Sequence, residues 1–249
     1  MEQLTATAHD SLLHLELNVP GKKNALTDIL RRELREAIVA AQTDPSVRAI
    51  VLSGAGGSFC SGGDISAMTS DPEVARARMT ILHDVVRMLL AGTRPVVAAV
   101  AGPAYGAGMS LALCCDQVIV DPSARFSASF GRVGLPPDLA LGFTLPRRVG
   151  EGRARRMLLS SSVTGAEEAV RIGLADEISA EGQLIETAMT RARELAAFTQ
   201  EAKGHVKAML TENAGSLDAV LLREMASYLT LLQSAEHQAA RDAFLKKSG

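Results

Sequence analysis

Two glycine-rich loops and one isolated aspartate are the residues of this chain best suited to chemistry. The loops are Phe59–Asp64 (FCSGGD) and Ala104–Ser110 (AYGAGMS), and the aspartate is Asp138, which follows two prolines. Glycine loops leave backbone N–H groups unhindered, and two such donors aimed at one point could hold a developing oxyanion. The apolar residues 139–141 would disfavour the charged form of the Asp138 carboxyl, which raises its pKa and suits it to acid/base work.

Each of these features also has a purely structural interpretation. Glycine relieves strain in tight turns, and for either loop alone a simple turn is the better interpretation. Aspartate after a bend is a common helix N-cap, and Asp138 stands directly before a helical pattern, LALGFTLPRR. From this residue alone a cap is favoured over catalysis. The presence of both loops, each after an apolar segment, shifts the balance somewhat toward a ligand site.

Other kinds of site have little support. Residues 54–64 do not match G-x-G-x-x-G with a following helix and a distal acid, and no G-x-x-x-x-G-K-[ST] is present. Ser110 lies in AGMSL rather than in G-x-S-x-G, and the five histidines show no partner pattern, so serine hydrolase chemistry is not expected. The basic run Arg147–Arg156 is interpreted as a solvated helix start rather than an anion site.

The loops need a sheet to position them, and the sequence predicts one. Apolar or alternating segments indicate strands at Leu12–Val19, Arg48–Gly54, Arg94–Gly102, Gln117–Asp121 and Ala124–Phe130. Helices are expected from Asp28, with Thr27 as N-cap, and over Pro72–Ala91. Strand–helix alternation up to about residue 150 predicts a mostly parallel sheet, in which ligands bind outside the carboxyl ends of the strands.

The remainder of the chain is predicted to be largely helical. Thr164 and Glu167 have the spacing of a capping box, and helices are expected from about Gln183, from about Gln200 and from Leu217 to the end. The simplest organisation is an α/β core over residues 1–190 that carries the site, followed by a helical region over residues 191–249.

Composition limits the classes of function. The chain has 249 residues, 47% hydrophobic and 22% charged, with a net charge of −2 and 3% aromatic residues, so neither a nucleic-acid nor a membrane partner is expected. No apolar run approaches the roughly 18 residues of a membrane span, and the first residues lack a secretory signal pattern. The three cysteines show no metal-ligand spacing, so we expect a cytoplasmic protein with reduced thiols and no metal site.

Residues Gly57–Ile65 (GSFCSGGDI) and Pro95–Val120 together resemble the crotonase, or enoyl-CoA hydratase/isomerase, superfamily. The correspondence runs through nearly the whole chain, from Asn24 to the C-terminal AFLKK. The resemblance implies an α/β fold of repeated ββα units with a helical C-terminal trimerisation region, assembled as a homotrimer or a dimer of trimers. It also implies an acyl-coenzyme A substrate, with coenzyme A present only as part of the thioester and no further cofactor.

By matching position, the resemblance places the oxyanion-hole donors on the backbone N–H groups of Gly63 and Ala107. The segments 23–26 and 61–65 would line the coenzyme A path. The residues expected to contact substrate are Lys23, Ala25, Leu26, Ser61, Gly62, Asp64, Ile65, Gly108, Ser110 and Phe130. Four lysines are weaker candidates for the coenzyme A phosphates, namely Lys22, Lys23, Lys246 and Lys247. Asp64 and Asp116 are interpreted as structural carboxylates that satisfy loop N–H groups.

The chain departs from the hydratases of this family at two positions. Hydratases carry one glutamate just after the second glycine loop and another after the next strand, and Ser110 and Phe130 occupy those positions here. Hydration requires one group to activate water and another to deliver a proton, which neither side chain can do near neutral pH. In contrast, Gly134, Leu135, Pro137 and Asp138 match the motif of ring-epoxyphenylacetyl-CoA and Δ3,Δ2-enoyl-CoA isomerases, which use one aspartate as acid/base.

Three hypotheses follow. The leading one is an isomerase that moves a double bond from the 3-enoyl to the 2-enoyl position with Asp138 as acid/base. The second is an enoyl-CoA hydratase or other acyl-CoA lyase, and the third is a non-catalytic acyl-CoA-binding protein. Residues 139–142 (LALG) are bulkier than the small, glycine-rich stretch that such isomerases often carry, so no acyl group is assigned.

Overall fold

The structure is a computed structural model that describes residues 2–212 and 216–247. Its main layer is a six-stranded sheet in the order β1-β2-β3-β4-β6-β9, and a smaller sheet has the order β5-β7-β8. The strands of the main sheet are β1 (Leu4–His9), β2 (Leu12–Leu17), β3 (Ala49–Gly54), β4 (Val96–Val100), β6 (Gln117–Val120) and β9 (Glu177–Ile178). Only β1 and β2 pair antiparallel in this sheet, so the predicted mostly parallel α/β fold is confirmed.

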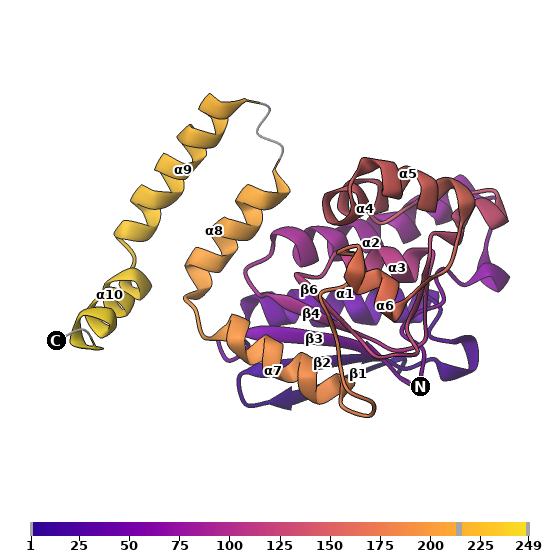
Figure 1. Ribbon diagram of the computed structural model, residues 1–249, viewed down its shortest axis with the longest axis horizontal. Helices are drawn as coiled ribbons and strands as arrows, with labels where there is room; N and C mark the ends of the chain where they lie inside the picture. The colour runs from indigo at the N-terminus through magenta and orange to yellow at the C-terminus, as the bar shows by residue number, and fades with distance from the viewer. Residues whose placement is uncertain (1, 213–215, 248–249) are drawn as a thin grey trace.

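Helices cover both faces of the main sheet (Figure 1). They are α1 (Asp28–Thr43), α2 (Pro72–Ala91), α3 (Ala107–Leu113), α4 (Leu141–Val149), α5 (Glu151–Ser160), α6 (Ala166–Arg171), α7 (Leu184–Ala196), α8 (Gln200–Thr211), α9 (Leu217–Leu232) and α10 (Ala235–Lys247). Short 3-10 helices are η1 (Pro20–Lys22), η2 (Ile65–Ala67) and η3 (Ser129–Val133). Thr27 caps α1 as predicted, since its hydroxyl accepts from the N–H of Leu30 at 3.1 Å.

The buried strands are continuously apolar because their alternating side chains enter two cores. Ile50 and Leu52 of β3 belong to the large core beneath α1, α2 and α3. Ala49 and Val51 of the same strand face the smaller core that α7 closes on the other side of the sheet. This two-sided burial explains why β3 and β4 read as hydrophobic runs rather than as alternating patterns. The predicted division between residues 190 and 191 falls within α7 and stays a prediction.

The second sheet is built from three short strands, β5 (Pro103–Tyr105), β7 (Arg125–Ser127) and β8 (Thr164–Gly165). The predicted strand Ala124–Phe130 is therefore limited to three residues and is followed by η3. The predicted capping box of Thr164 and Glu167 is wrong. Thr164 pairs with Phe126 of β7, and the helix α6 begins after Gly165 without a side-chain cap.

The C-terminal region is helical, as predicted, but it divides at residues 233–234. The helix expected from Leu217 to the end is two helices, α9 and α10, because the Ser234 hydroxyl accepts from the N–H of His237 and starts a new turn. Helix α8 is fixed to the core by the ammonium of Lys207, which donates to the Asp116 carboxylate at 2.5 Å. In Figure 1, α9 and α10 lie apart from the sheet. No helix in the described ranges combines the length and apolarity needed to cross a membrane.

Candidate active site

A cavity of about 560 Å³ lies at the carboxyl ends of β3 and β4, between α2 and the segment 135–140. Most of the side chains that line it are apolar, and the polar exceptions are few. The lining residues are Leu26, Arg31, Gly63, Met68, Thr69, Ala75, Arg78, Met79, Leu82, His83, Ala107, Leu135, Pro136, Pro137, Asp138, Leu139 and Ala140. The predicted donors Gly63 and Ala107 and the predicted base Asp138 thus line one concave cavity, as is typical of ligand sites.

The two glycine loops are joined directly to each other. The N–H of Cys60 donates to the carbonyl of Pro103, and the N–H of Tyr105 donates back to the carbonyl of Cys60, both at 3.0 Å. Gly62 has φ +107°, and a Cβ at this position would lie 2.9 Å from the Tyr105 carbonyl oxygen. Glycine is therefore required here, because the backbone of the first loop packs against the backbone of the second.

Two residues at this junction, Gly63 and Ala107, line the cavity and carry free backbone donors. Within residues 2–212 and 216–247, the N–H groups of Gly63 and Ala107 donate to no acceptor of the chain. Ala107 is the first residue of α3, where an N–H has no partner within the helix. A free backbone N–H can stabilise a negatively charged oxygen that comes within hydrogen-bond distance of it.

Gly108 fixes the distance between α3 and the first loop. A Cβ on Gly108 would lie 2.1 Å from the carbonyl oxygen of Cys60, so only glycine permits this approach. Gly108 is buried and does not line the cavity. The structure thus gives it a packing role behind the donors.

The Asp138 carboxyl has one oxygen atom without a partner among the described residues. Its Oδ1 is buried and accepts no hydrogen bond from the part of the chain that the structure describes. Burial raises the pKa of Asp138 to about 6, although the positive charge of Arg31 acts in the opposite direction. A carboxyl with this pKa can both take and return a proton near neutral pH.

Asp138 is not the cap of the following helix, so the structural alternative for this residue is wrong. Helix α4 begins after Ala140, which makes no side-chain cap hydrogen bond. Leu139 and Ala140 both have left-handed backbones, with φ of 46° and 58°. These two left-handed residues separate Asp138 from the start of α4. A left-handed backbone costs about 1–2 kcal/mol in a residue other than glycine. The strained segment directs the carboxyl to the cavity instead of to the helix N–H groups.

The two segments predicted to line the coenzyme A path lie side by side. The N–H of Ser61 donates to the Lys23 carbonyl at 2.9 Å, and the N–H of Leu26 donates to the Gly62 carbonyl at 2.8 Å. Leu26 lines the cavity, whereas Ala25 is buried beneath it and Ile65 is exposed.

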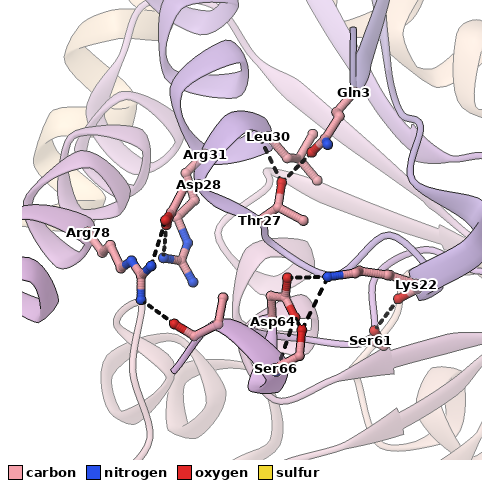
Figure 2. Close-up of polar contacts among 11 residues, drawn as sticks. Gln3, Lys22, Thr27, Asp28, Leu30, Arg31, Ser61, Asp64, Ser66 and Arg78 are labelled. Carbon is pink, nitrogen blue, oxygen red and sulfur yellow. Dashed lines mark hydrogen bonds and ion pairs between the residues drawn. The ribbon is translucent and has the colours of Figure 1, made fainter. Parts of the chain in front are cut away.

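Asp64 has the structural role expected of it. Its carboxylate accepts from the N–H of Ser66 and forms an ion pair of 2.6 Å with Lys22 (Figure 2). Asp116 likewise accepts from the N–H of Val96 at 2.7 Å. The hydrogen bonds of Lys22 join η1 to η2, and its side chain remains half exposed. The side chains of Lys246 and Lys247 lie outside the described part of the chain.

Ser110 and Phe130 are both buried and neither lines the cavity. The Ser110 hydroxyl donates to the carbonyl of Gly106, the N-cap residue of its own helix, at 3.3 Å. Phe130 packs near Gly106, where a Cβ would lie 3.9 Å from the ring. The two positions where a carboxylate would be needed for hydration therefore hold side chains that fill the core.

Sequence reasoning missed most of the cavity wall that α1 and α2 supply. Arg31 comes from α1, and Arg78 and His83 come from α2 together with apolar side chains such as Met79. These residues sit in ordinary amphipathic patterns, and no local signal distinguishes them from other helix residues. Their position becomes visible only when α1 and α2 pack against each other (Figure 1).

Comparisons with known proteins agree on one family. Residues 7–249 match a family model described as enoyl-CoA hydratase/isomerase. A Mycobacterium tuberculosis protein named "Probable enoyl-CoA hydratase EchA14" is 39% identical over 224 residues, which cover 86% of this chain and 84% of that protein. The 1,2-epoxyphenylacetyl-CoA isomerase of Escherichia coli is 31% identical over 253 residues, covering 99% and 97%.

A solved structure gives the same result for the fold. The crystal structure of an enoyl-CoA hydratase from Polaromonas sp. JS666 superposes with a TM-score of 0.91 at 30% identity, over 98% of this chain and 97% of that one. The similarity includes the helical C-terminal region, since almost the full length of both chains is covered.

Proposed function

Because the chain belongs to the enoyl-CoA hydratase/isomerase family, the crotonase superfamily, we propose that it is an isomerase using Asp138 as its single acid/base. In the proposed reaction it moves a double bond of an acyl-CoA from C3–C4 to C2–C3. Membership of the family makes it an acyl-CoA enzyme with a mixed α/β crotonase fold. The observation that carries the finer assignment is the Asp138 carboxyl, whose buried Oδ1 has no partner among the described residues, at the cavity that Gly63 and Ala107 also line.

The reaction needs an oxyanion site, and two backbone donors are available for it. We assign the thioester oxygen to the N–H groups of Gly63 and Ala107. Proton loss from C2 places negative charge on that oxygen, and each donor typically lowers the barrier by about 3–4 kcal/mol. Such donors act strongly in a cavity whose other walls are largely apolar.

One carboxylate can carry out both proton transfers. Asp138 takes a proton from C2, the electron pair moves into an enolate, and the double bond shifts as Asp138 returns the proton to C4. The carboxyl ends in the state in which it began, and no water, metal or further cofactor is consumed. Coenzyme A enters only as part of the substrate, and we propose that its path runs along residues 23–26 and 61–65.

A hydratase is the second candidate, because several relatives carry that name. Against it stand the buried Ser110 and Phe130, which supply no carboxylate for activating water. A non-catalytic acyl-CoA-binding protein is the third candidate. The pair of free donors and a carboxyl with a raised pKa argue for chemistry rather than for binding alone.

The assay is direct. Purified protein is incubated with a 3-enoyl-CoA while the ultraviolet absorbance of the conjugated 2-enoyl thioester is followed, and we expect the absorbance to rise. In parallel, crotonyl-CoA is incubated in water labelled with ¹⁸O, and no label is expected at C3. Label at C3 without formation of conjugated product would favour the hydratase, and binding without either reaction would favour the non-catalytic protein.

A further inference from the structure

Two arginines line the cavity, and neither takes part in the proposed proton transfers. Arg31 projects from α1 and Arg78 from α2, 47 residues apart in the chain. Their side chains are only 12% and 21% exposed. A cavity for a hydrocarbon chain alone has no use for two guanidinium groups, because charged groups lose hydration when they are buried.

The two guanidinium groups share one carboxylate, that of Asp28. Figure 2 shows Asp28 joined to Arg31 at 3.1 Å and to Arg78 at 2.6 Å. Arg78 also donates to the carbonyl of Ala67 at 2.6 Å, so both of its terminal nitrogens have acceptors. Arg78 and Asp28 therefore hold η2, α1 and α2 together and fix the position of Arg31.

Arg31 keeps unused donors. A guanidinium has five N–H donors, and Arg31 donates only from Nη1 to an acceptor among the described residues. Its Nε is buried and has no partner there. A buried charged donor without an acceptor is costly to leave unsatisfied. Asp138 lines the same cavity and its carboxyl feels the charge of Arg31, but no hydrogen bond joins the two among the described residues.

We propose that Arg31 binds an oxygen atom on the acyl group and makes the enzyme selective for acyl-CoA esters with an oxygen acceptor remote from the thioester. A carboxylate and a neutral carbonyl both carry an oxygen lone pair that can accept a hydrogen bond from the unused N–H groups of Arg31. Arg31 is thus a specificity-determining residue of the proposed acyl-CoA site, and the inference rests on that site. It does not depend on which reaction Asp138 performs.

Binding of unreactive saturated ligands tests the proposal without turnover. Isothermal titration calorimetry would compare hexanoyl-CoA with 5-oxohexanoyl-CoA and adipoyl-CoA. We expect at least one oxygenated ester to bind about tenfold tighter or more, as a hydrogen bond to a charged group supports. If only adipoyl-CoA binds tighter than hexanoyl-CoA, the acceptor is a carboxylate. If 5-oxohexanoyl-CoA also binds tighter, a neutral carbonyl oxygen is an acceptor as well.

Three variants separate the roles of the residues. Arg31→Met is expected to abolish the preference while hexanoyl-CoA still binds. Arg35→Met, one turn further along α1 and paired with Asp84 outside the cavity, is the matched control and should retain it. Asp138→Asn should also retain the binding preference for oxygenated esters. This variant therefore separates the role of Arg31 from the assignment of Asp138 as the acid/base.

Two results would overturn the inference. The first is equal affinity of the wild-type protein for all three esters, a measurement that needs no variant to fold. The second is an unchanged preference in Arg31→Met. Failure of every ester to bind would instead remove the acyl-CoA site itself, and with it the basis of the proposal.

Discussion

At the scale of single residues, Asp138 combines a buried Oδ1 that has no hydrogen-bond partner among the described residues with a strained neighbouring backbone. Each of these features costs stability, and none contributes to packing. Residues kept in such a state are typical of sites where function requires it.

The neighbouring thiols of Cys60 and Cys114 stay neutral, because burial raises the pKa of each to about 12.

The pH dependence of the reaction should report the pKa of Asp138. Burial raises this pKa to about 6, Arg31 is the opposing charge, and the base must be ionised to take a proton. We therefore expect kcat/KM for a 3-enoyl-CoA to increase as the pH rises through about 6 and to level off above it. Initial rates over this range would show the transition, and a flat profile between roughly pH 5 and pH 7 would be inconsistent with Asp138 as the base.

Replacing Asp138 by asparagine should stabilise the folded protein. The pKa of Asp138 is raised from 3.8 to about 6 on folding, so ionisation near neutral pH opposes folding, and stability falls as the pH rises through this interval. The neutral amide removes this penalty, and we expect a gain of about 1–3 kcal/mol at pH 7. Denaturant unfolding would measure it.

Asp116→Asn is the matched control for that experiment. It is the same substitution at a carboxylate that pairs with the buried ammonium of Lys207, and it should destabilise the protein. A loss of stability in Asp138→Asn comparable to that in Asp116→Asn would show that the Asp138 carboxylate has a stabilising partner in the folded state.

At the scale of elements, the site depends on the junction between the first glycine loop and α3. The loop and the strand β5 exchange hydrogen bonds through Cys60, and Gly108 brings the helix against the same residue. The positions of both backbone donors therefore depend on one tight contact.

Gly108→Ala should impair both stability and catalysis. The added Cβ would lie 2.1 Å from the Cys60 carbonyl oxygen, and backbone must move to relieve the overlap. We expect a loss of about 3 kcal/mol in unfolding free energy and a fall in kcat of about tenfold or more from displaced donors.

Gly142→Ala in α4 is the contrasting substitution, because its added Cβ would meet no atom within 4 Å among the described residues outside its own helix. It should stabilise the protein by about 0.5–1 kcal/mol and leave activity intact. Equal behaviour of the two variants would show that the contact at Gly108 does not position the donors.

Features set by local sequence patterns could be predicted from the sequence, whereas features set by contacts between distant residues could not. Strands such as β3 and β4 were predictable because burial on both faces makes them apolar throughout. The capping box at Thr164 failed because strand pairing with β7 determines the backbone there. Arg31 and Arg78 could not be predicted as neighbours, since only the packing of two helices brings them to one cavity.

The segment around Asp138 was likewise predictable only in part. The apolar residues 139–141 led us to expect a raised pKa for Asp138, and the pKa of about 6 agrees with that expectation. The left-handed turns at Leu139 and Ala140 that prevent capping had no sequence signal, because neither residue favours that conformation. Tertiary contacts, such as the thiol of Cys114 donating to the Leu139 carbonyl, hold them in place.

At the scale of the whole molecule, α9 carries an apolar surface that the described residues leave exposed. Helix α9 packs on α8 and α10 only in part (Figure 1). Its exposed apolar residues are Leu221, Leu222, Met225, Tyr228, Leu229 and Leu232. A surface of this kind is typical of an interface between subunits. We propose that it contributes to a homotrimer or a dimer of trimers.

Leu222→Arg should disrupt that assembly. Leu222 is 72% exposed in the single chain, and a buried unpaired charge at a subunit interface is strongly unfavourable. Light scattering after size exclusion should give a trimer or hexamer for the wild type and smaller species for the variant. Leu159→Arg on α5, where the leucine is 81% exposed, is the control and should leave the assembly unchanged. A wild-type monomer would contradict the proposed assembly.

The most direct test of the central claim is the turnover number of Asp138→Asn with a 3-enoyl-CoA, measured beside the wild type at pH 7. Asparagine keeps the shape of the side chain but cannot take a proton from C2. The account predicts that the variant remains folded and loses about 100-fold or more of kcat, the range typical of a general base. Equal turnover by the variant and the wild type would contradict the assignment of Asp138 as the acid/base.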